Sequence, residues 1–115
     1  MAEPNEVSFT EEAIGGVGGA GSKVTWRLQA GEVGMWASKP LNTKKTIHIA
    51  GVSVLDVAIE GTNLSDRSHP VTLRETQNLE KIAGEGLFVV HENTLFFRPV
   101  CREGVDVEVV AIVTT

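Results

Sequence analysis

The segment from Val52 to Asn63 constrains the fold of this chain more than any other stretch. Its apolar residues recur at every second position, at Leu55, Val57 and Ile59. A period of two places one set of side chains on the core face of a β-strand and the alternate set in water. Gly61 and Asn63, which both tolerate the backbone angles of a turn, end this strand.

The same alternation recurs along most of the 115 residues, a length typical of one domain. Strands are expected over 23–28, 46–50, 52–60, 71–74, 79–82, 87–91, 95–100 and 105–113, with a short segment around 35–37. The stretch 79–82 could instead be a single helical turn. No long amphipathic helix is found, so the crossover helices of a parallel sheet are missing. The chain is therefore predicted to be all-β, a single antiparallel β-sandwich or jelly roll of about eight strands.

Local patterns also predict how some of these strands connect. Glu92-Asn93-Thr94 is expected to join two neighbouring strands as a hairpin, and Gly51 indicates a tight turn or a bulge. In the last strand every second residue from Val105 to Val113 is in phase, while Val110 and Ile112 make the other face apolar too. That pattern predicts a central strand, or an outer face covered by another chain.

Residues 1–22 differ in composition from the predicted sandwich domain at 23–115. Small and acidic residues lead into a glycine-rich run over 15–21, which favours a flexible N-terminal arm. This run matches the spacing G-x-G-x-x-G, but a strand instead of a helix follows it, so a linker is the better interpretation than a dinucleotide site. The apolar residues Val7, Phe9 and Ile14 make this arm a candidate protein interface.

Composition limits the classes of partner and compartment. The formal charge of −5 disfavours nonspecific nucleic-acid binding, which needs clustered lysine and arginine. Cys101 is the single cysteine, so neither an intrachain disulfide nor a thiolate metal site is expected. No apolar run approaches the roughly 20 residues of a membrane span, and the acidic start is unlike a signal peptide. We therefore expect synthesis in the cytoplasm, without a membrane or nucleic-acid partner.

The residues that could carry chemistry are scattered. His48, His69 and His91 lie in different segments without the spacing of a metal site, and Asp66 beside His69 has no accompanying nucleophile signature. The sequence therefore predicts no catalytic residue, metal or cofactor, and no enzyme activity.

The sequence leads to different predictions for the burial of the two tryptophans. Trp26 is in phase with its strand and is expected in the core. Met35 and Trp36 lie between turn regions, so Trp36 could be buried or could form an exposed interface anchor with Met35.

Three patterns, taken in order along the chain, resemble a known family. Val24-Thr25-Trp26 opens a strand, the stretch from Val57 to Asn63 reads V-A-I-E-G-T-N, and Leu95 to Val100 reads L-F-F-R-P-V before a turn at Gly104. This order resembles the small all-β proteins encoded beside major capsid genes in tailed bacteriophages, the capsid decoration or cement proteins. The resemblance covers residues 24–113; where the family has Asp-Gly and Trp after the asparagine, this chain has the residues 64–67, L-S-D-R.

The resemblance implies a jelly roll or related sandwich on the outside of an icosahedral shell. It implies the major capsid protein as partner, a homodimer or homotrimer, and a location at the virion surface. The expected function is to stabilise a phage capsid by bridging neighbouring capsid subunits, with the arm and Met35-Trp36 as contacts. The alternative is a glycan- or receptor-binding sandwich of a phage tail or fibre, which requires an exposed Trp26 or Trp36 beside polar loops.

Overall fold

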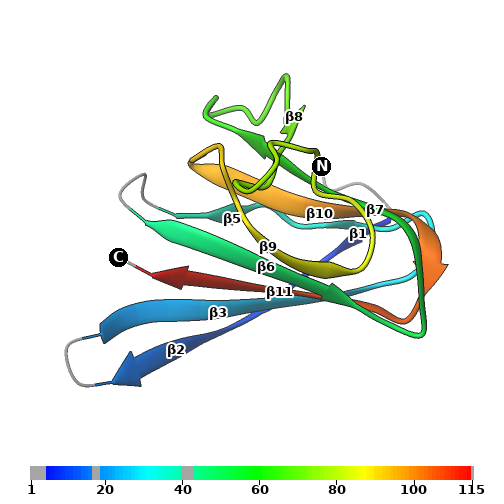
Figure 1. The fold of residues 1–115 in the computed structure, drawn as a ribbon, viewed down its shortest axis with the longest axis horizontal. Coiled ribbons are helices and arrows are strands. Elements are labelled where there is room, and N and C mark those ends of the chain that lie inside the picture. Colours follow the sequence, from blue (N-terminus) through cyan, green and yellow to red (C-terminus); the bar gives the residue numbers. More distant parts are fainter. Residues whose placement is uncertain (1–4, 17–18, 40–42, 115) are drawn as a thin grey trace.

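A computed structural model describes residues 5–16, 19–39 and 43–114, and within them it contains eleven strands and no helix. The strands form two sheets that pack face to face (Figure 1). The first sheet runs β1 (Glu6–Val7), β4 (Val33–Gly34), β10 (Phe96–Val105), β7 (Ser53–Thr62) and β8 (Val71–Thr72), with β5 (Ala37–Ser38) also paired to β10. The second runs β2 (Thr10–Gly16), β3 (Gly19–Leu28), β11 (Val107–Thr114), β6 (Lys44–Ala50) and β9 (Gly86–Val89). The predicted all-β sandwich is confirmed. The strand count exceeds eight because β1, β2, β4 and β5 lie outside the eight predicted strands.

The core lies between the sheets and is built around Trp26. This side chain is fully buried, and its ring makes edge-on contacts with Phe9 and Phe97 at centroid distances of 5.5 and 5.8 Å. The indole N–H donates to the Met35 carbonyl at 3.1 Å, which satisfies the polar edge of the ring. The prediction that Trp26 is a core residue is confirmed.

The last strand occupies the centre of the second sheet. β11 pairs with β3 on one side and with β6 on the other. Val107, Val109, Ala111 and Val113 face the core, and the alternate residues are half-buried. The central position predicted from its two apolar faces is confirmed.

The predicted hairpin at residues 92–94 is wrong. β9 pairs with β6 in the second sheet, whereas β10 belongs to the first sheet, so the connection crosses between them. The Val90 N–H donates to the Lys45 carbonyl at 3.0 Å and holds the segment against β6 up to the crossing. Gly51 lies in a second crossing, between β6 and β7, where a Cβ would stand 2.7 Å from the Asp106 carbonyl.

Two apolar residues that were expected in phase with the core are exposed instead. Leu55 is 65% exposed, because β-bulges between β7 and β10 shift the register next to it and Val54 packs against the core in its place. Val105 is 49% exposed and ends β10, since Asp106 adopts a φ of +48° that turns the chain into the second sheet. Residues 79–82 form neither a strand nor a helical turn, although Ile82 is buried.

The described residues of the segment 1–22 lie within the two sheets. β1 pairs with β4, and β2 pairs with β3 along its whole length. Val7 and Phe9 pack against the core. Residues 1–4 and 17–18, which belong to the predicted arm, lie outside the described residues.

Candidate protein-binding face

The outward face of the first sheet carries a group of large side chains. In β10, Phe97 and Cys101 are buried between the sheets, so Phe96, Arg98 and Val100 point outward by the alternation of a strand. Burial raises the pKa of the Cys101 thiol, and its surroundings leave it inert. The outward residues therefore define the chemistry of this face.

Arg98 is the centre of a row of side chains that crosses the sheet. Its guanidinium lies 4.4 Å from the centre of the Trp36 ring, and its Nε lies 3.2 Å from the Glu60 carboxylate. The side chains of Arg98 and Glu60 are only 15% and 19% exposed, and Trp36 is half-buried. A guanidinium over an indole is attracted by the ring electrons, and the carboxylate fixes its plane. The row is therefore a rigid, partly desolvated surface.

A second arginine covers the neighbouring aromatic ring. The guanidinium of Arg67 lies 4.4 Å from the centre of the Phe96 ring. Its loop, residues 63–70, is held over the sheet by the Thr62 hydroxyl, which donates to the Ser68 carbonyl at 3.0 Å. We call Trp36, Glu60, Arg67, Phe96 and Arg98 the arginine–aromatic face.

The same loop contains the histidine that the sequence placed beside an aspartate. The Ser68 hydroxyl donates to Asp66 at 2.7 Å, and the His69 Nδ1 lies 3.1 Å from that hydroxyl oxygen. The hydrogen bonds from Ser68 hold the pKa of Asp66 below its usual value. These three side chains form hydrogen bonds with one another within one exposed turn. Within the described ranges no group of three or more histidine, cysteine or acidic residues could hold a metal ion.

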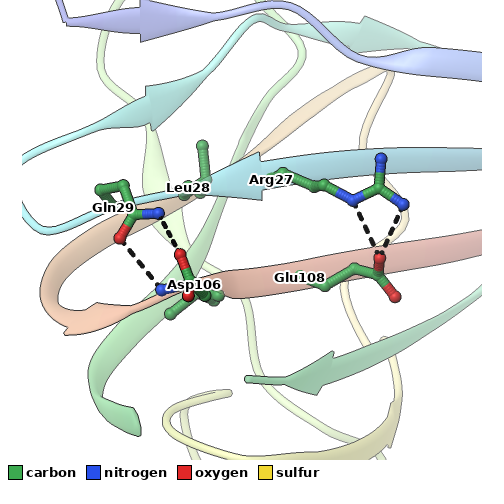
Figure 2. A pocket seen from close by; sticks show the side chains of 6 residues that line it. Arg27, Leu28, Gln29, Asp106 and Glu108 are labelled. Carbon is green, nitrogen blue, oxygen red and sulfur yellow. Dashed lines mark hydrogen bonds and ion pairs between the residues drawn. The ribbon is translucent and has the colours of Figure 1, made fainter. Parts of the chain in front are cut away.

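The outer side of the second sheet has a pocket of about 260 Å³ at the end of β3 (Figure 2). Six residues line it: Arg27, Leu28, Gln29, Asp106, Val107 and Glu108. Gln29 donates to the Asp106 carboxylate at 2.5 Å and accepts from its backbone N–H at 3.0 Å, while Arg27 pairs with Glu108 at 3.2 Å. These hydrogen bonds and this ion pair link the end of β3 to the start of β11. They therefore stabilise the turn at Asp106.

The five interface residues expected from the sequence lie in different parts of the structure. Val7 and Phe9 pack inward, Ile14 is half-buried in β2, and Met35 is 41% exposed. Trp36 is the one that belongs to the arginine–aromatic face. The other four residues of the face were missed, although the alternation of 95–100 already placed Phe96 and Arg98 on one side of a strand.

Comparison with known proteins adds no assignment for this chain. No protein-family model matches it, and no curated protein sequence matches it. Among the residues that the structure describes, there is no helix long and apolar enough to cross a membrane. A functional proposal therefore depends on the sequence and on the geometry of the arginine–aromatic face.

Proposed function

We propose that this chain is a non-catalytic structural protein of a tailed-phage virion, made in the host cytoplasm and located at the capsid surface. It decorates the capsid and stabilises it by bridging neighbouring subunits of the major capsid protein. The row Trp36–Arg98–Glu60 is the observation that carries this proposal. The resemblance of the sequence to capsid decoration proteins is the reason for proposing the major capsid protein as partner, and the row is the surface that would meet it.

The side chains of this face suit protein recognition. Tryptophan, arginine and phenylalanine are enriched at the centres of protein interfaces, where they contribute most of the binding energy. Trp36 and Arg98 already hold each other in one geometry, so little side-chain entropy is lost when a partner covers them. A sandwich with a closely packed core presents such a face without changing shape.

A glycan-binding role in a tail or fibre has less support. Trp26, one of the two tryptophans that such a role could use, is fully buried between the sheets. One face of the Trp36 ring is occupied by the Arg98 guanidinium. A sugar platform needs an accessible ring face, so the protein-binding role fits this surface better.

Co-sedimentation with undecorated shells of the phage that encodes the chain tests the proposal. The wild-type chain is expected to bind to saturation at a fixed number of copies per shell. Trp36→Ala and Arg67→Gln are expected to weaken binding at least tenfold, or about 1.4 kcal/mol. His48→Ala, on the exposed outer face of the second sheet, is the matched control and should bind like the wild type.

Two outcomes would contradict the proposal. A wild-type chain that stays in the supernatant removes the capsid as partner, and binding on a glycan array would then favour the tail or fibre role. Shell binding that Trp36→Ala and Arg67→Gln leave unchanged would move the contact away from the arginine–aromatic face. Arg67 is exposed, so its variant tests the face without disturbing the core.

A further inference from the structure

The second sheet has one long, regular edge strand. β2 is the terminal strand of that sheet (Figure 1). It has seven residues. Its register with β3 runs from Thr10 opposite Thr25 to Gly16 opposite Gly19 without a shift, and its sequence contains no proline. Short length, prolines, bulges and charged side chains are the usual devices that stop an edge from pairing with another chain. β2 has only the last of these, at Glu11 and Glu12.

The other sheet edges among the described residues are short or covered. β1 and β8 have two residues each. Beyond β9, the Thr76 N–H donates to the Val89 carbonyl at 3.0 Å, and Glu75 forms a bridge with Val90. β2 therefore differs from the other edges.

The free side of β2 offers backbone groups for a new ladder. In an antiparallel edge strand, alternate residues direct both N–H and C=O away from the sheet. Among the described residues, no turn or loop forms a backbone hydrogen bond with residues 10–16. An added strand would satisfy these groups.

The charges of β2 are matched within the chain. Glu11 and Glu12 would repel a second acidic strand, but the Lys39 ammonium forms an ion pair with Glu11, and the Lys23 ammonium lies 4.0 Å from Glu12. Lys39 reaches across from the end of β5, and its side chain is only 15% exposed. The edge is therefore close to neutral although the whole chain carries a formal charge of −5.

From this geometry we infer that β2 pairs with β2 of a second copy of this chain, antiparallel across a two-fold axis at Ala13. Antiparallel pairing of identical strands is self-complementary, so it closes as a dimer and joins the second sheets of two copies into one continuous sheet. With the axis at Ala13, Glu12 lies opposite Ile14 and Glu11 lies opposite Gly15, so no like charges face each other. This surface is separate from the arginine–aromatic face, and it leaves that face free for the proposed capsid contact.

Light scattering on the purified full chain, with a variant at the axis, tests this inference. The wild type is expected to have twice its chain mass of 12.3 kDa. Ala13 is exposed. Ala13→Lys would place two lysines directly opposite each other, with Cβ atoms about 5 Å apart, and like charges in opposed positions destabilise pairing. This variant should therefore be a folded monomer with an unchanged circular dichroism spectrum.

Cysteine cross-linking provides a second measurement that does not depend on the lysine variant folding. Ala13→Cys should form a disulfide-linked dimer on mild oxidation, because the two Cβ atoms face each other across the axis. Thr10→Cys is the matched control, since its two copies would lie about 20 Å apart in this register and should not cross-link. Cys101 is buried and should not react in either variant.

Three outcomes would overturn the inference. These are a wild-type monomer at about 100 μM, a trimer, or a dimer that Ala13→Lys leaves intact and Ala13→Cys does not trap. The shell-binding assay distinguishes a failure of the dimer inference from a failure of the capsid proposal. Ala13→Lys should keep the arginine–aromatic face, and Trp36→Ala should keep the dimer.

Discussion

Among the residues that the structure describes, Lys45 is the most deeply buried charged residue. It is 3% exposed at the start of β6, and its ammonium donates to Asn93 at 2.8 Å and to Thr43 at 3.2 Å. The ammonium also lies 5.8 Å from the centre of the Phe97 ring. Burial of the charge lowers the pKa of Lys45 from its ordinary value of 10.5.

This lowered pKa makes the stability of the fold depend on pH. Because the unfolded chain holds the Lys45 proton more firmly than the folded chain, the contribution of Lys45 to the free energy of unfolding rises with pH. The rise occurs between the lowered pKa and 10.5. Lys45→Met should remove it, and urea unfolding at pH 7 and pH 10 measures the change. Lys44→Met, at the exposed neighbouring position, is the control and should keep the wild-type dependence; an identical dependence in Lys45→Met would contradict the prediction.

At the scale of single residues, the sequence predicted burial better than contact. Trp26 could be placed in the core because its strand alternates with a period of two, which is a local property. Leu55 could not be placed correctly, since the bulges that turn it outward arise from pairing with β10. The contact of Trp36 with Arg98 joins residues 62 positions apart in the chain, and only the tertiary structure brings them together.

Among the elements, β1 and β2 decide whether the N-terminal segment belongs to the sandwich. Phe9, between these strands, is half-buried, and its ring lies 5.5 Å from that of Trp26. Phe9→Ala would leave a space beside Trp26 and is expected to lower the free energy of unfolding by about 2–4 kcal/mol. Ser8→Ala, at the exposed preceding position, should change it by less than about 0.5 kcal/mol. Urea unfolding measures both, and a Phe9→Ala effect as small as that of the control would show that the segment does not support the core.

The strands themselves were more predictable than their partners. The alternation that located 46–50, 95–100 and most of the last strand depends only on which residues prefer a core. The sheet to which a strand belongs depends on connections that cross the sandwich, as at Gly51 and at 90–95. A short polar turn between two apolar runs is compatible with a hairpin or with such a crossing, and the sequence predicted the hairpin for 92–94.

For the whole molecule, this topology determines how fast the chain folds. Most strand pairs join distant segments: β11 pairs with β3 and β10 pairs with β7, whereas β2 and β3 are joined by a short local connection. Distant pairing requires long loops to close before contacts form, and this slows folding. We therefore expect refolding in milliseconds to seconds, in the range of other all-β sandwiches.

Stopped-flow fluorescence can measure this rate through Trp26, which is fully buried in the folded state. Trp36→Phe removes the second tryptophan. Comparison of its circular dichroism spectrum with that of the wild type checks that the variant folds in the same way. The main phase should be independent of protein concentration because it forms the core within one chain. A dimer through β2 adds a later bimolecular phase that accelerates with concentration and disappears in Ala13→Lys. A main phase faster than about 100 μs would contradict the prediction, since it would mean that local contacts, and not the pairing of distant strands, limit the folding of this sandwich.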